Sequence, residues 1–278
     1  MARMPGPRIA LIHATPLAVD PVNRAFERLW PIATRMNLLD DSLSADRVRE
    51  GALTPAMTRR FETLALYARD TGCAGILFTC SAFGPAIEAA GRACIAAQGV
   101  PDVVIANAGI SVGIDTEVFD DLEMMRATYE TNVIGVAATF HPFMRAMRER
   151  GSGTLVGIAS VAGIRGLPGH GAYCSSKAAV ISYCETLRGE LRPSGVKVVT
   201  LLPGYIDTPL TRDNRYSMPF LMQADDFADQ AFRAIASGTS YRVIPWQMGV
   251  VAKLLRLLPN ALFDRALAGR PRKHRQGE

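Results

Sequence analysis

Tyr173 and Lys177 are the residues whose types and spacing most clearly suggest chemistry. Side chains four residues apart lie on the same face of a helix, about 5–6 Å apart at Cβ. A phenol has a pKa of about 10, too high for a useful base at neutral pH, but a neighbouring ammonium favours the phenolate and lowers that pKa. Such a pair can donate and accept a proton. The spacing alone is common in helices, so a purely structural role stays open until neighbouring motifs are considered.

Two further polar motifs follow predicted strands upstream of the tyrosine. Ser160 comes after the apolar run 154–158, and Asn107-Ala108-Gly109 comes after the run 103–106. Ligands of open parallel α/β sheets bind at the carboxyl ends of the strands. We therefore expect these side chains to lie near Tyr173, at one edge of a sheet.

Other candidates lie between and beyond these strands. Asn132 falls within a long helical pattern between them. A strand predicted over 196–202 is followed by four more candidates, which are Pro203, Gly204, Ile206 and Thr208. The glycine-rich stretch from Gly163 to Gly171 could be a phosphate cradle, but its place between Ser160 and Tyr173 favours an active-site loop.

Alternating short apolar runs and longer helical patterns must position these groups. Strands are predicted at 9–13, 36–39, 75–79, 103–106, 154–158 and 196–202. Helices are predicted at 21–34, 55–70, 85–98, 122–148 (in one or two pieces) and 172–191. Thr54 and Pro55 favour a helix start at that point. The alternation predicts an α/β fold: a three-layer, Rossmann-like parallel sheet with helices on both faces.

The composition is that of an ordinary globular protein, with 278 residues, 49% hydrophobic and 21% charged, enough for one large or two small domains. The net charge is +5, and the last nine residues supply +3 of it, with four basic residues against Glu278. This distribution argues against a nucleic-acid-binding face. Five cysteines without a CxxC spacing indicate a reducing compartment, and no metal-binding motif is predicted.

The two ends of the chain bear on its location. The start lacks a signal-peptide core, and no run reaches the roughly 18 apolar residues of a transmembrane helix, so we expect a cytoplasmic protein. The chain ends with apolar helices predicted over 248–258 and 261–268 and a basic segment, 270–275. The simplest interpretation is a substrate lid and a subunit contact of a homo-oligomer, with a solvated tail. Peripheral membrane contact is the alternative, because an apolar helix plus basic residues can bind anionic lipid.

The region 91–278 resembles the catalytic part of a short-chain dehydrogenase/reductase. Five motifs in this order carry the resemblance: Asn107-Ala108-Gly109, Asn132, Ser160, Tyr173-x-x-x-Lys177 and Pro203-Gly204. The resemblance implies an oxidoreductase that interconverts a small-molecule carbonyl and an alcohol with NAD or NADP. Tyr173 would exchange a proton with the substrate oxygen, and Ser160 would hydrogen-bond and orient that oxygen. Lys177 would lower the pKa of Tyr173 and bind the nicotinamide ribose, and Asn132 would position a water in the proton relay.

The same resemblance implies which residues bind the cofactor. Tyr173 and Lys177 would take part in the proton chemistry and also bind the cofactor. The others, expected near the adenosine side or the nicotinamide end, are Asn107, Ala108, Gly109, Pro203, Gly204, Ile206 and Thr208. The hydride belongs to the cofactor, while the protein supplies position and proton chemistry.

The usual start of such a dehydrogenase is missing. A Thr-Gly-x-x-x-Gly-x-Gly turn should follow the first strand, where glycines let the backbone approach the pyrophosphate. Here that turn reads His13-Ala14-Thr15-Pro16-Leu17, without glycine. Asp40-Asp41 falls where an acidic selector is expected after the second strand, although it could simply end the strand. We therefore expect a degraded cofactor pocket.

Residues 7–89 resemble instead the N-terminal half of the aspartate/glutamate racemase superfamily. The matching pieces are the segments 8–13, 36–43 and 75–83, and Cys80 matches that family's first catalytic cysteine. A thiol placed before a helix N-terminus has a lowered pKa. The family's second cysteine comes from a C-terminal half that is absent here, since Cys174 and Cys184 lie in dehydrogenase-like sequence.

The chain is thus expected to join a racemase-like segment, 1–90, to a dehydrogenase catalytic region, 91–278. The two families conflict in strand order. The dehydrogenase places strand four beside strand one, whereas the racemase half places strand three there, so strand three must relocate or the sheet edge must be irregular. Three functions stay open: the oxidoreductase, a non-catalytic fusion or remnant that binds no cofactor, and a racemase-like isomerase.

Overall fold

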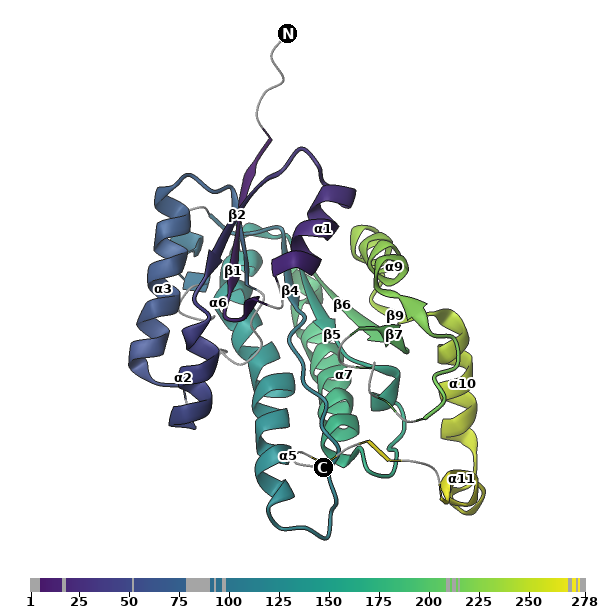
Figure 1. Ribbon diagram of the computed structural model, residues 1–278. Helices are drawn as coiled ribbons and strands as arrows, with labels where there is room; N and C mark the ends of the chain where they lie inside the picture. The colour runs from purple at the N-terminus through teal and green to yellow at the C-terminus, as the bar shows by residue number, and fades with distance from the viewer. Residues whose placement is uncertain are drawn as a thin grey trace. The chain divides into compact units, whose positions relative to one another are not determined.

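The computed structural model describes residues 6–16, 19–51, 53–78, 91–92, 94–96, 99–208, 211, 214, 216–269, 272–273 and 275. The chain forms two compact units. The first comprises residues 1–101 with 138–146, and the second comprises residues 102–137 with 147–278. Figure 1 labels most of the helices and strands of both units.

The first unit is built on a parallel three-stranded sheet of β1 (Arg8–His13), β2 (Thr34–Leu39) and β3 (Gly75–Phe78), in the order β2-β1-β3. Successive side chains of a strand point to opposite faces. Ile9 and Leu11 of β1 pack against helix α1 (Val19–Leu29). Ala10 and Ile12 pack on the other side, where α2 (Ser42–Glu50) and α3 (Pro55–Asp70) contribute to the core. The unit therefore has helices on both faces of its sheet.

Helix α3 spans the residues that the sequence predicts, 55–70. Thr54 caps it, because its side-chain oxygen accepts a hydrogen bond from the Met57 N–H at 3.3 Å. Pro55 suits the first turn because its missing N–H would have no partner there. Phe61 and Ala65, one turn apart, are buried against the sheet.

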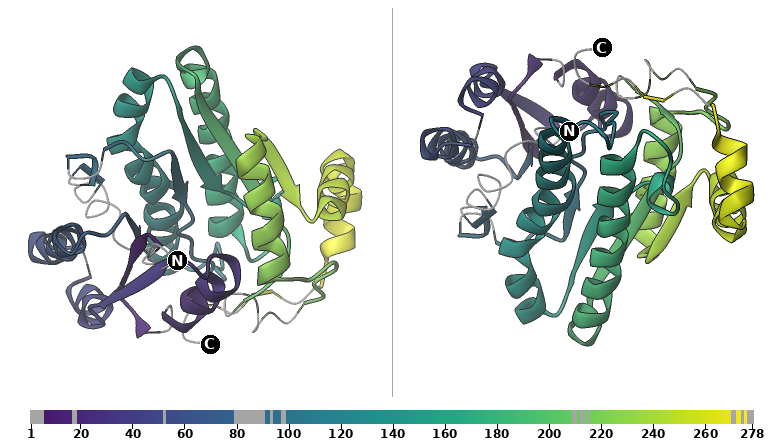
Figure 2. Two further views of the ribbon diagram at one scale, coloured as in Figure 1. Left: turned by 90° about the horizontal axis from the view of Figure 1, so that it is seen from above. Right: turned by 90° about the horizontal axis from the view of Figure 1, so that it is seen from below.

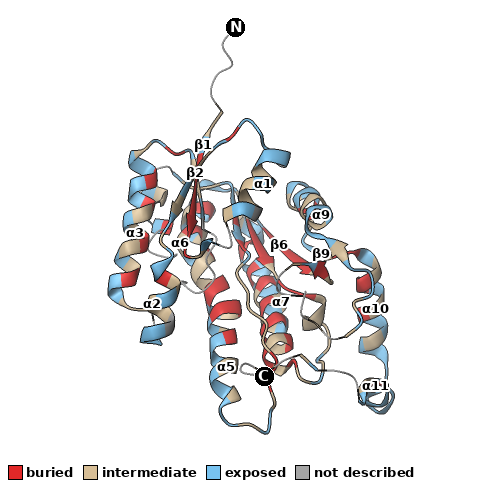
Figure 3. Cartoon of the chain, in the orientation of Figure 1, coloured by how far each residue is buried: buried red, intermediate tan, exposed pale blue. Residues whose placement is uncertain are grey.

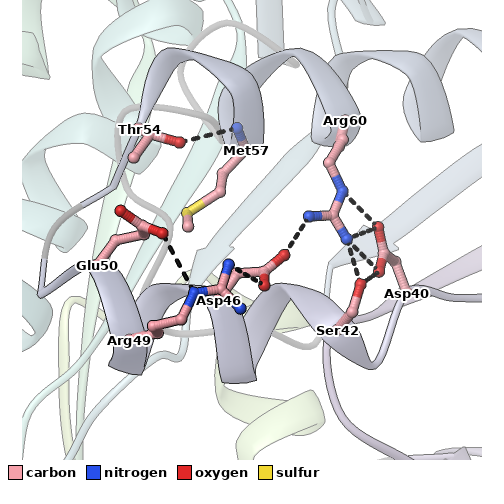
Figure 4. Close-up of polar contacts among 8 residues, drawn as sticks. All are labelled: Asp40, Ser42, Asp46, Arg49, Glu50, Thr54, Met57 and Arg60. Carbon is pink, nitrogen blue, oxygen red and sulfur yellow. Dashed lines mark hydrogen bonds and ion pairs between the residues drawn. The ribbon is translucent and has the colours of Figure 1, made fainter.

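A polar network ties α2 and α3 to the end of β2 (Figure 4). Arg60 of α3 donates from Nε to Asp40 Oδ2 at 2.9 Å and from Nη1 to Asp46 Oδ2 at 2.6 Å. Ser42 Oγ donates to Asp40 Oδ1 at 2.7 Å. Burial alone would raise the pKa of Asp40, but the hydrogen bonds from Arg60 and Ser42 outweigh this and lower the pKa. Asp40 is therefore part of a structural ion pair.

The second unit is built on a parallel sheet of β4 (Val103–Ala106), β5 (Gly153–Ile158), β6 (Val196–Pro203) and β9 (Tyr241–Ile244), in that order. Helix α9 (Ala224–Ser237) packs on the face that carries Val199 and Leu201. Helix α7 (Gly171–Leu191) packs on the other face, where the Cys184 thiol hydrogen-bonds Thr200. Figure 2 shows helices on both sides of these strands. The predicted α/β class, with parallel strands between helices, is confirmed.

The long helical pattern before β5 is interrupted. It consists of α5 (Asp121–Tyr129), a π-helical turn (Glu130–Ile134) and α6 (Gly135–Arg150). π-helical turns inside helices are frequent at functional sites. This one contains Asn132, which the sequence selected as a candidate.

The conflict in strand order is resolved by two separate sheets. β2 and β3 pair with both edges of β1, so β1 has no edge left for β4. Among the described strands β4 pairs only with β5, and Val103 and Ile105 on one of its faces are 43% and 49% exposed. β3 therefore does not relocate: it keeps the position beside β1 that the racemase-like order implies.

Several elements were not expected from the sequence. These are α2, α9, the edge strand β9 and the short parallel strands β7 (Ile206–Asp207) and β8 (Met222–Gln223). The helix predicted over 85–98 lies largely outside the described residues. The C-terminal helices α10 (Trp246–Leu257) and α11 (Asn260–Leu267) are present, and no described helix is both long and apolar enough to cross a bilayer.

Arg165 joins the two C-terminal helices to the loop before α7. Its guanidinium donates to the carbonyl of Leu258 at 2.8 Å and to Asn260 Oδ1 at 3.1 Å, and it also donates to the carbonyl of Leu255. The same group lies 3.7 Å from the centroid of the Phe263 ring. One side chain thus fixes the end of α10 and the start of α11.

Of the described residues in the basic C-terminal segment, Arg272 is exposed, but Lys273 and Arg275 contact the second unit instead of extending into solvent as expected. Lys273 Nζ donates to Ser111 Oγ at 3.1 Å, and Arg275 pairs with Asp121 at 2.9 Å. Arg275 also forms a parallel β-bridge with Gly113. Acidic and hydroxyl groups of the second unit attract these cations, so the expectation of a solvated tail is corrected for these two residues.

Candidate active site

Tyr173 and Lys177 lie one turn apart on α7, with the Lys177 ammonium 5.9 Å from the centroid of the Tyr173 ring. Lys177 is 3% exposed, and its Nζ donates to the carbonyl of Ile158, at the end of β5, at 2.8 Å. Burial disfavours the charged form and lowers the pKa of Lys177 to about 8. At neutral pH the site therefore holds a buried cation at the carboxyl end of the sheet.

Ser160 joins this pair. It follows β5 and caps the short turn Val161–Gly163, where its Oγ accepts from the Ala162 N–H at 3.2 Å. Its side chain also hydrogen-bonds the phenol of Tyr173. Burial raises the pKa of Tyr173, and the hydrogen bond from Ser160 lowers it in part. The net direction is upward, which corrects the expectation of a lowered pKa: desolvation of the partly buried phenol outweighs the hydrogen bond, and Lys177 donates to Ile158.

Asn132 connects the loop after β4 to α7. It is fully buried, and its Oδ1 accepts from the Ile110 N–H at 2.8 Å. Its Nδ2 donates to the carbonyl of Ile110 at 3.0 Å and to Ser176 Oγ at 3.0 Å. These partners are protein groups, so the carboxamide fixes the elements around the site.

Two glycines allow loops to close on α7. A Cβ at Gly109 would lie 3.1 Å from Lys177 Nζ and 3.4 Å from Asn132 Oδ1. A Cβ at Gly163 would lie 2.7 Å from the carbonyl carbon of Lys177, which is closer than real Cβ atoms come. This approach favours the interpretation of the glycine-rich stretch as an active-site loop. We call Gly109, Asn132, Ser160, Tyr173 and Lys177 the candidate cluster.

The remaining candidates lie at the same edge of the sheet, after β4 and β6, but no described contact joins them to Tyr173 or Lys177. Asn107, which is exposed, and Ala108 follow β4. Pro203 ends β6, and the Gly204 N–H donates to the carbonyl of Ile244 at 2.8 Å. Ile206 is buried in β7. The Thr208 N–H donates to Thr211 Oγ1 at 3.2 Å.

Two aromatic residues beside the cluster were not among the candidates expected from the sequence. His170 directly precedes α7, and its Nε2 lies 3.2 Å from the hydroxyl of Tyr216. The position of His170, three residues before Tyr173, was the signal in the sequence that could have placed it near the cluster. No sequence pattern pointed to Tyr216, which is 46 residues away from His170.

Comparison with known families shows to which family the chain belongs. The family model described as short chain dehydrogenase matches residues 48–218, which is more than half of the chain. The chain belongs to the short-chain dehydrogenase family. The match begins at residue 48, so it extends into the segment that the sequence analysis assigned to the racemase-like half.

Related proteins support the assignment of this dehydrogenase to its family. An uncharacterized oxidoreductase of Myxococcus xanthus is 41% identical over 175 residues, which cover 63% of this chain and 69% of the relative. A 3-ketodihydrosphingosine reductase of Bacteroides thetaiotaomicron is 34% identical over 143 residues, covering 51% of this chain and 52% of the relative. A short chain dehydrogenase from Burkholderia cenocepacia, solved in complex with NADP, shares the fold with a TM-score of 0.63 at 20% identity, over 95% of this chain and 99% of that one.

Among the described residues of the first unit, those directly after β1 (14–16) include no glycine of the kind that the family's diphosphate cradle uses. His13, the last residue of β1, and Ala14 are buried, and the carbonyl of Ala14 accepts from Ser44 Oγ at 2.6 Å. His13 Nε2 lies 3.0 Å from Asn37 Oδ1. Asp40, at the position expected for a selector, is paired with Arg60. The candidate cluster of the second unit therefore offers groups that would hold the nicotinamide end of NAD(P), whereas the described residues after β1 in the first unit include none of the glycines expected for a diphosphate.

Two expectations concern groups outside the cluster. Cys80 lies outside the described residues, so its environment is not described. Among the described residues no group of three or more His, Cys, Asp or Glu side chains could hold a metal ion.

Proposed function

We propose that this dehydrogenase interconverts a carbonyl compound and an alcohol with NAD or NADP. The observation that carries the proposal is the hydrogen bond between Ser160 and Tyr173 beside the buried ammonium of Lys177. A serine, a phenol and a cation converge where the strands end, which is where substrates bind in such sheets. The bound cofactor supplies or accepts the hydride.

Each residue of the cluster has a task in this reaction. Tyr173, whose pKa is raised by burial, keeps its proton and donates it to the substrate oxygen during reduction. Ser160 donates a hydrogen bond to the same oxygen and orients the carbonyl. The Lys177 cation stabilises the phenolate that forms after proton transfer. Asn132 links the π-helical turn to the loop after β4 and to α7, and so fixes their relative positions.

Seven residues would complete the cofactor site beside Lys177 and Tyr173. They are Asn107, Ala108, Gly109, Pro203, Gly204, Ile206 and Thr208. Because the turn after β1 lacks glycines, the diphosphate would lose a backbone cradle of the usual kind. We therefore expect NAD(P) to bind weakly, with a dissociation constant well above that of a complete dehydrogenase.

The substrate we propose is a hydrophobic ketone. The relative from Bacteroides thetaiotaomicron reduces a 3-keto lipid according to its name, and the C-terminal helices of this chain are apolar. The test is NADPH and NADH oxidation with 3-ketodihydrosphingosine and with cyclohexanone. We expect turnover, a preference for the lipid and a loss of at least about 100-fold in Tyr173→Phe. Tyr183→Phe, which removes a hydroxyl farther along α7, should stay within about twofold. No oxidation with either ketone would contradict the proposal.

A non-catalytic chain is the second candidate, favoured by the unusual turn after β1. It predicts that neither cofactor binds, whereas the oxidoreductase predicts weak binding. The third candidate, a racemase-like isomerase, depends on Cys80 alone. Circular dichroism of L- and D-aspartate or glutamate incubated with the protein tests it, and unchanged optical activity would exclude it.

We also propose that the N-terminal strands are of racemase-like origin. The order β2-β1-β3 supports this origin, because it differs from the dehydrogenase order in the position of β3. The family model of the dehydrogenase begins its match at residue 48. The proposed racemase-like origin therefore applies best to the residues before position 48. Sequencing the locus and its transcript would show whether the fusion is present in the gene, and separate reading frames would contradict a single natural chain.

The exposed face of α10 supports a proposal of peripheral membrane contact (Figure 3). Trp246, Val250, Leu254 and Leu257 recur at helical spacing and are between 47% and 80% exposed. Exposed cations flank them at Lys253 and Arg256. Apolar side chains beside cations suit an anionic bilayer surface. The basic tail contributes less than expected, because Arg275 is paired with Asp121.

Sedimentation with anionic phosphatidylglycerol vesicles tests this contact. The full chain should pellet with the vesicles, and the double variant Leu254→Glu, Leu257→Glu should remain in the supernatant. Phe232→Glu, which places a charge at an exposed position of α9, is the matched control. Equal pelleting of all three would contradict membrane contact. We further propose a cytoplasmic location and a homo-oligomer; light scattering that gives the mass of one chain would exclude the latter.

A further inference from the structure

His170 and Tyr216 form a close pair between two elements of the second unit. His170 is 7% exposed and directly precedes α7, and Tyr216 lies between β7 and β8. The His170 Nε2 atom lies 3.2 Å from the Tyr216 hydroxyl, and Nδ1 lies 3.1 Å from the carbonyl oxygen of Pro168. The rings meet edge to face, with centroids 5.5 Å apart and planes inclined by 73°.

The chemistry of these partners fixes the direction of the bond. The Pro168 carbonyl can only accept, so the proton of a neutral imidazole resides on Nδ1, and Nε2 is left as an acceptor. Burial, aided by the charge of Lys273, lowers the pKa of His170 and keeps the ring neutral at neutral pH, although the contact with Pro168 opposes this. Burial raises the pKa of Tyr216 to about 12. Tyr216 therefore donates to His170.

The pair lies beside the candidate cluster. The nearby Tyr205, Tyr173 and Cys174 add to the raised pKa of Tyr216, which places the phenol close to the first turn of α7. The Tyr205 ring, just after the end of β6, packs against Tyr216 with centroids 6.1 Å apart. Tyr216 is thus held between the start of α7 and the end of β6. The titratable groups that face His170 are Tyr216 from this segment and Lys273 from the C-terminal segment.

We propose that His170 is a positioning residue that holds Tyr216 beside Tyr173 and so fixes the segment 216–223 as one wall of the substrate site. His170 and Tyr173 are three residues apart, so the same helical start carries the proton donor and the anchor of the wall. The wall presents uncharged aromatic rings next to the reacting oxygen, which suits an apolar group on the substrate. The contact of this wall with a substrate rests on the proposed function. The hydrogen bond between His170 and Tyr216 and the fixed position of segment 216–223 do not.

Two variants remove the hydrogen bond and keep an aromatic ring in place: Tyr216→Phe and His170→Phe. Tyr183→Phe is the matched control, because it removes a half-buried hydroxyl from α7 without touching the pair. The chain has four histidines, so imidazole NMR signals can be followed one by one, and the signal lost in His170→Phe assigns His170.

Histidine NMR tests the bond in the full-length protein without any need for activity. In the unaltered chain His170 should be the Nδ1–H tautomer with a pKa below the usual value. A donated hydrogen bond to Nε2 stabilises the neutral ring, so Tyr216→Phe should raise the pKa of His170 and shift its Nε2 resonance. Tyr183→Phe should leave both unchanged. If the pKa of His170 in Tyr216→Phe were the same as in the unaltered chain, the hydrogen bond between His170 and Tyr216 would be overturned.

Backbone hydrogen exchange tests the positioning role. Exchange at residues 216–223 should accelerate about five- to tenfold in either phenylalanine variant, and no further in the double variant, because both changes remove one shared bond. In turnover, KM for the ketone should rise by a similar factor while kcat stays within about twofold. Unchanged exchange would overturn the proposal. If the unaltered chain shows no turnover, the proposed function fails, while NMR and exchange still decide on His170.

Discussion

The side chain of Asn132 hydrogen-bonds both the N–H and the carbonyl of Ile110, at 2.8 and 3.0 Å. One carboxamide thereby satisfies two backbone groups of the loop after β4, while its Nδ2 also reaches Ser176 of α7. The residue lies in the π-helical turn, so three elements of the site meet at a single buried side chain.

Asn132→Ala should destabilise the second unit by about 2–4 kcal/mol, because it leaves buried backbone groups of Ile110 and the Ser176 hydroxyl without this partner. The measurement is urea unfolding followed by circular dichroism. Asn107→Ala, at an exposed position after β4, should change stability by less than about 0.5 kcal/mol. Equal effects of the two variants would contradict the role given to Asn132.

Lys177→Met should stabilise the protein at pH 7 by about 1–2 kcal/mol while it abolishes turnover. The folded-state pKa of Lys177 is lowered from 10.5 to about 8, so burying its charge opposes folding below pH 8. Between about pH 8 and 10.5 the unfolded chain binds more protons, and the stability of the unaltered protein rises relative to the variant. Unfolding free energies measured from pH 7 to 10.5 give the difference, and a constant difference would contradict a buried ammonium.

Asp40→Asn should lower stability at pH 7 by about 1 kcal/mol, a modest value because the ion pair with Arg60 is partly solvated. The folded-state pKa of Asp40 lies below 3.8, so its contribution is present above that pH and is lost as the pH falls through the folded value. Thermal unfolding of the variant and of Asp41→Asn should therefore differ at pH 7 and converge in acid. A deficit that stays the same from pH 7 into acid would contradict this origin.

Arg165→Ala should loosen α10 and α11, because it removes bonds to the carbonyl of Leu258 and to Asn260 together with the contact with Phe263. We expect a loss of about 2–3 kcal/mol and faster chymotrypsin cleavage within 246–267. Arg256→Ala, at an exposed position of α10, is the control. Cleavage at the unaltered rate in Arg165→Ala would show that these helices are held by other contacts.

Much of the fold could be predicted because local signals and tertiary structure agree. Helix α3 has a capping threonine, a first-turn proline and an apolar face, and its observed bounds match the predicted ones. α2 was missed because its sequence is largely polar and is held by the ion pairs of Arg60. α9 was missed although it carries two acidic residues in its first turn and the left-handed Gly238 at its end.

The cluster could be predicted because its residues follow strands or share a helix face. Ser160 and Gly109 follow β5 and β4, and Tyr173 and Lys177 are one turn apart. The partner of His170 could not be predicted, since Tyr216 reaches it across a segment without periodicity. The direction of the Tyr173 pKa also required the structure, because burial is a tertiary property and outweighs the expected influence of Lys177.

Calorimetric titration with NADH and NADPH tests the central claim most directly. We predict that at least one cofactor binds, with a dissociation constant in the range of about 0.1–1 mM, and that Lys177→Met weakens it at least about tenfold. Tyr183→Phe should bind like the unaltered chain. Absence of heat from both cofactors at millimolar concentration would contradict a working dehydrogenase site in this protein.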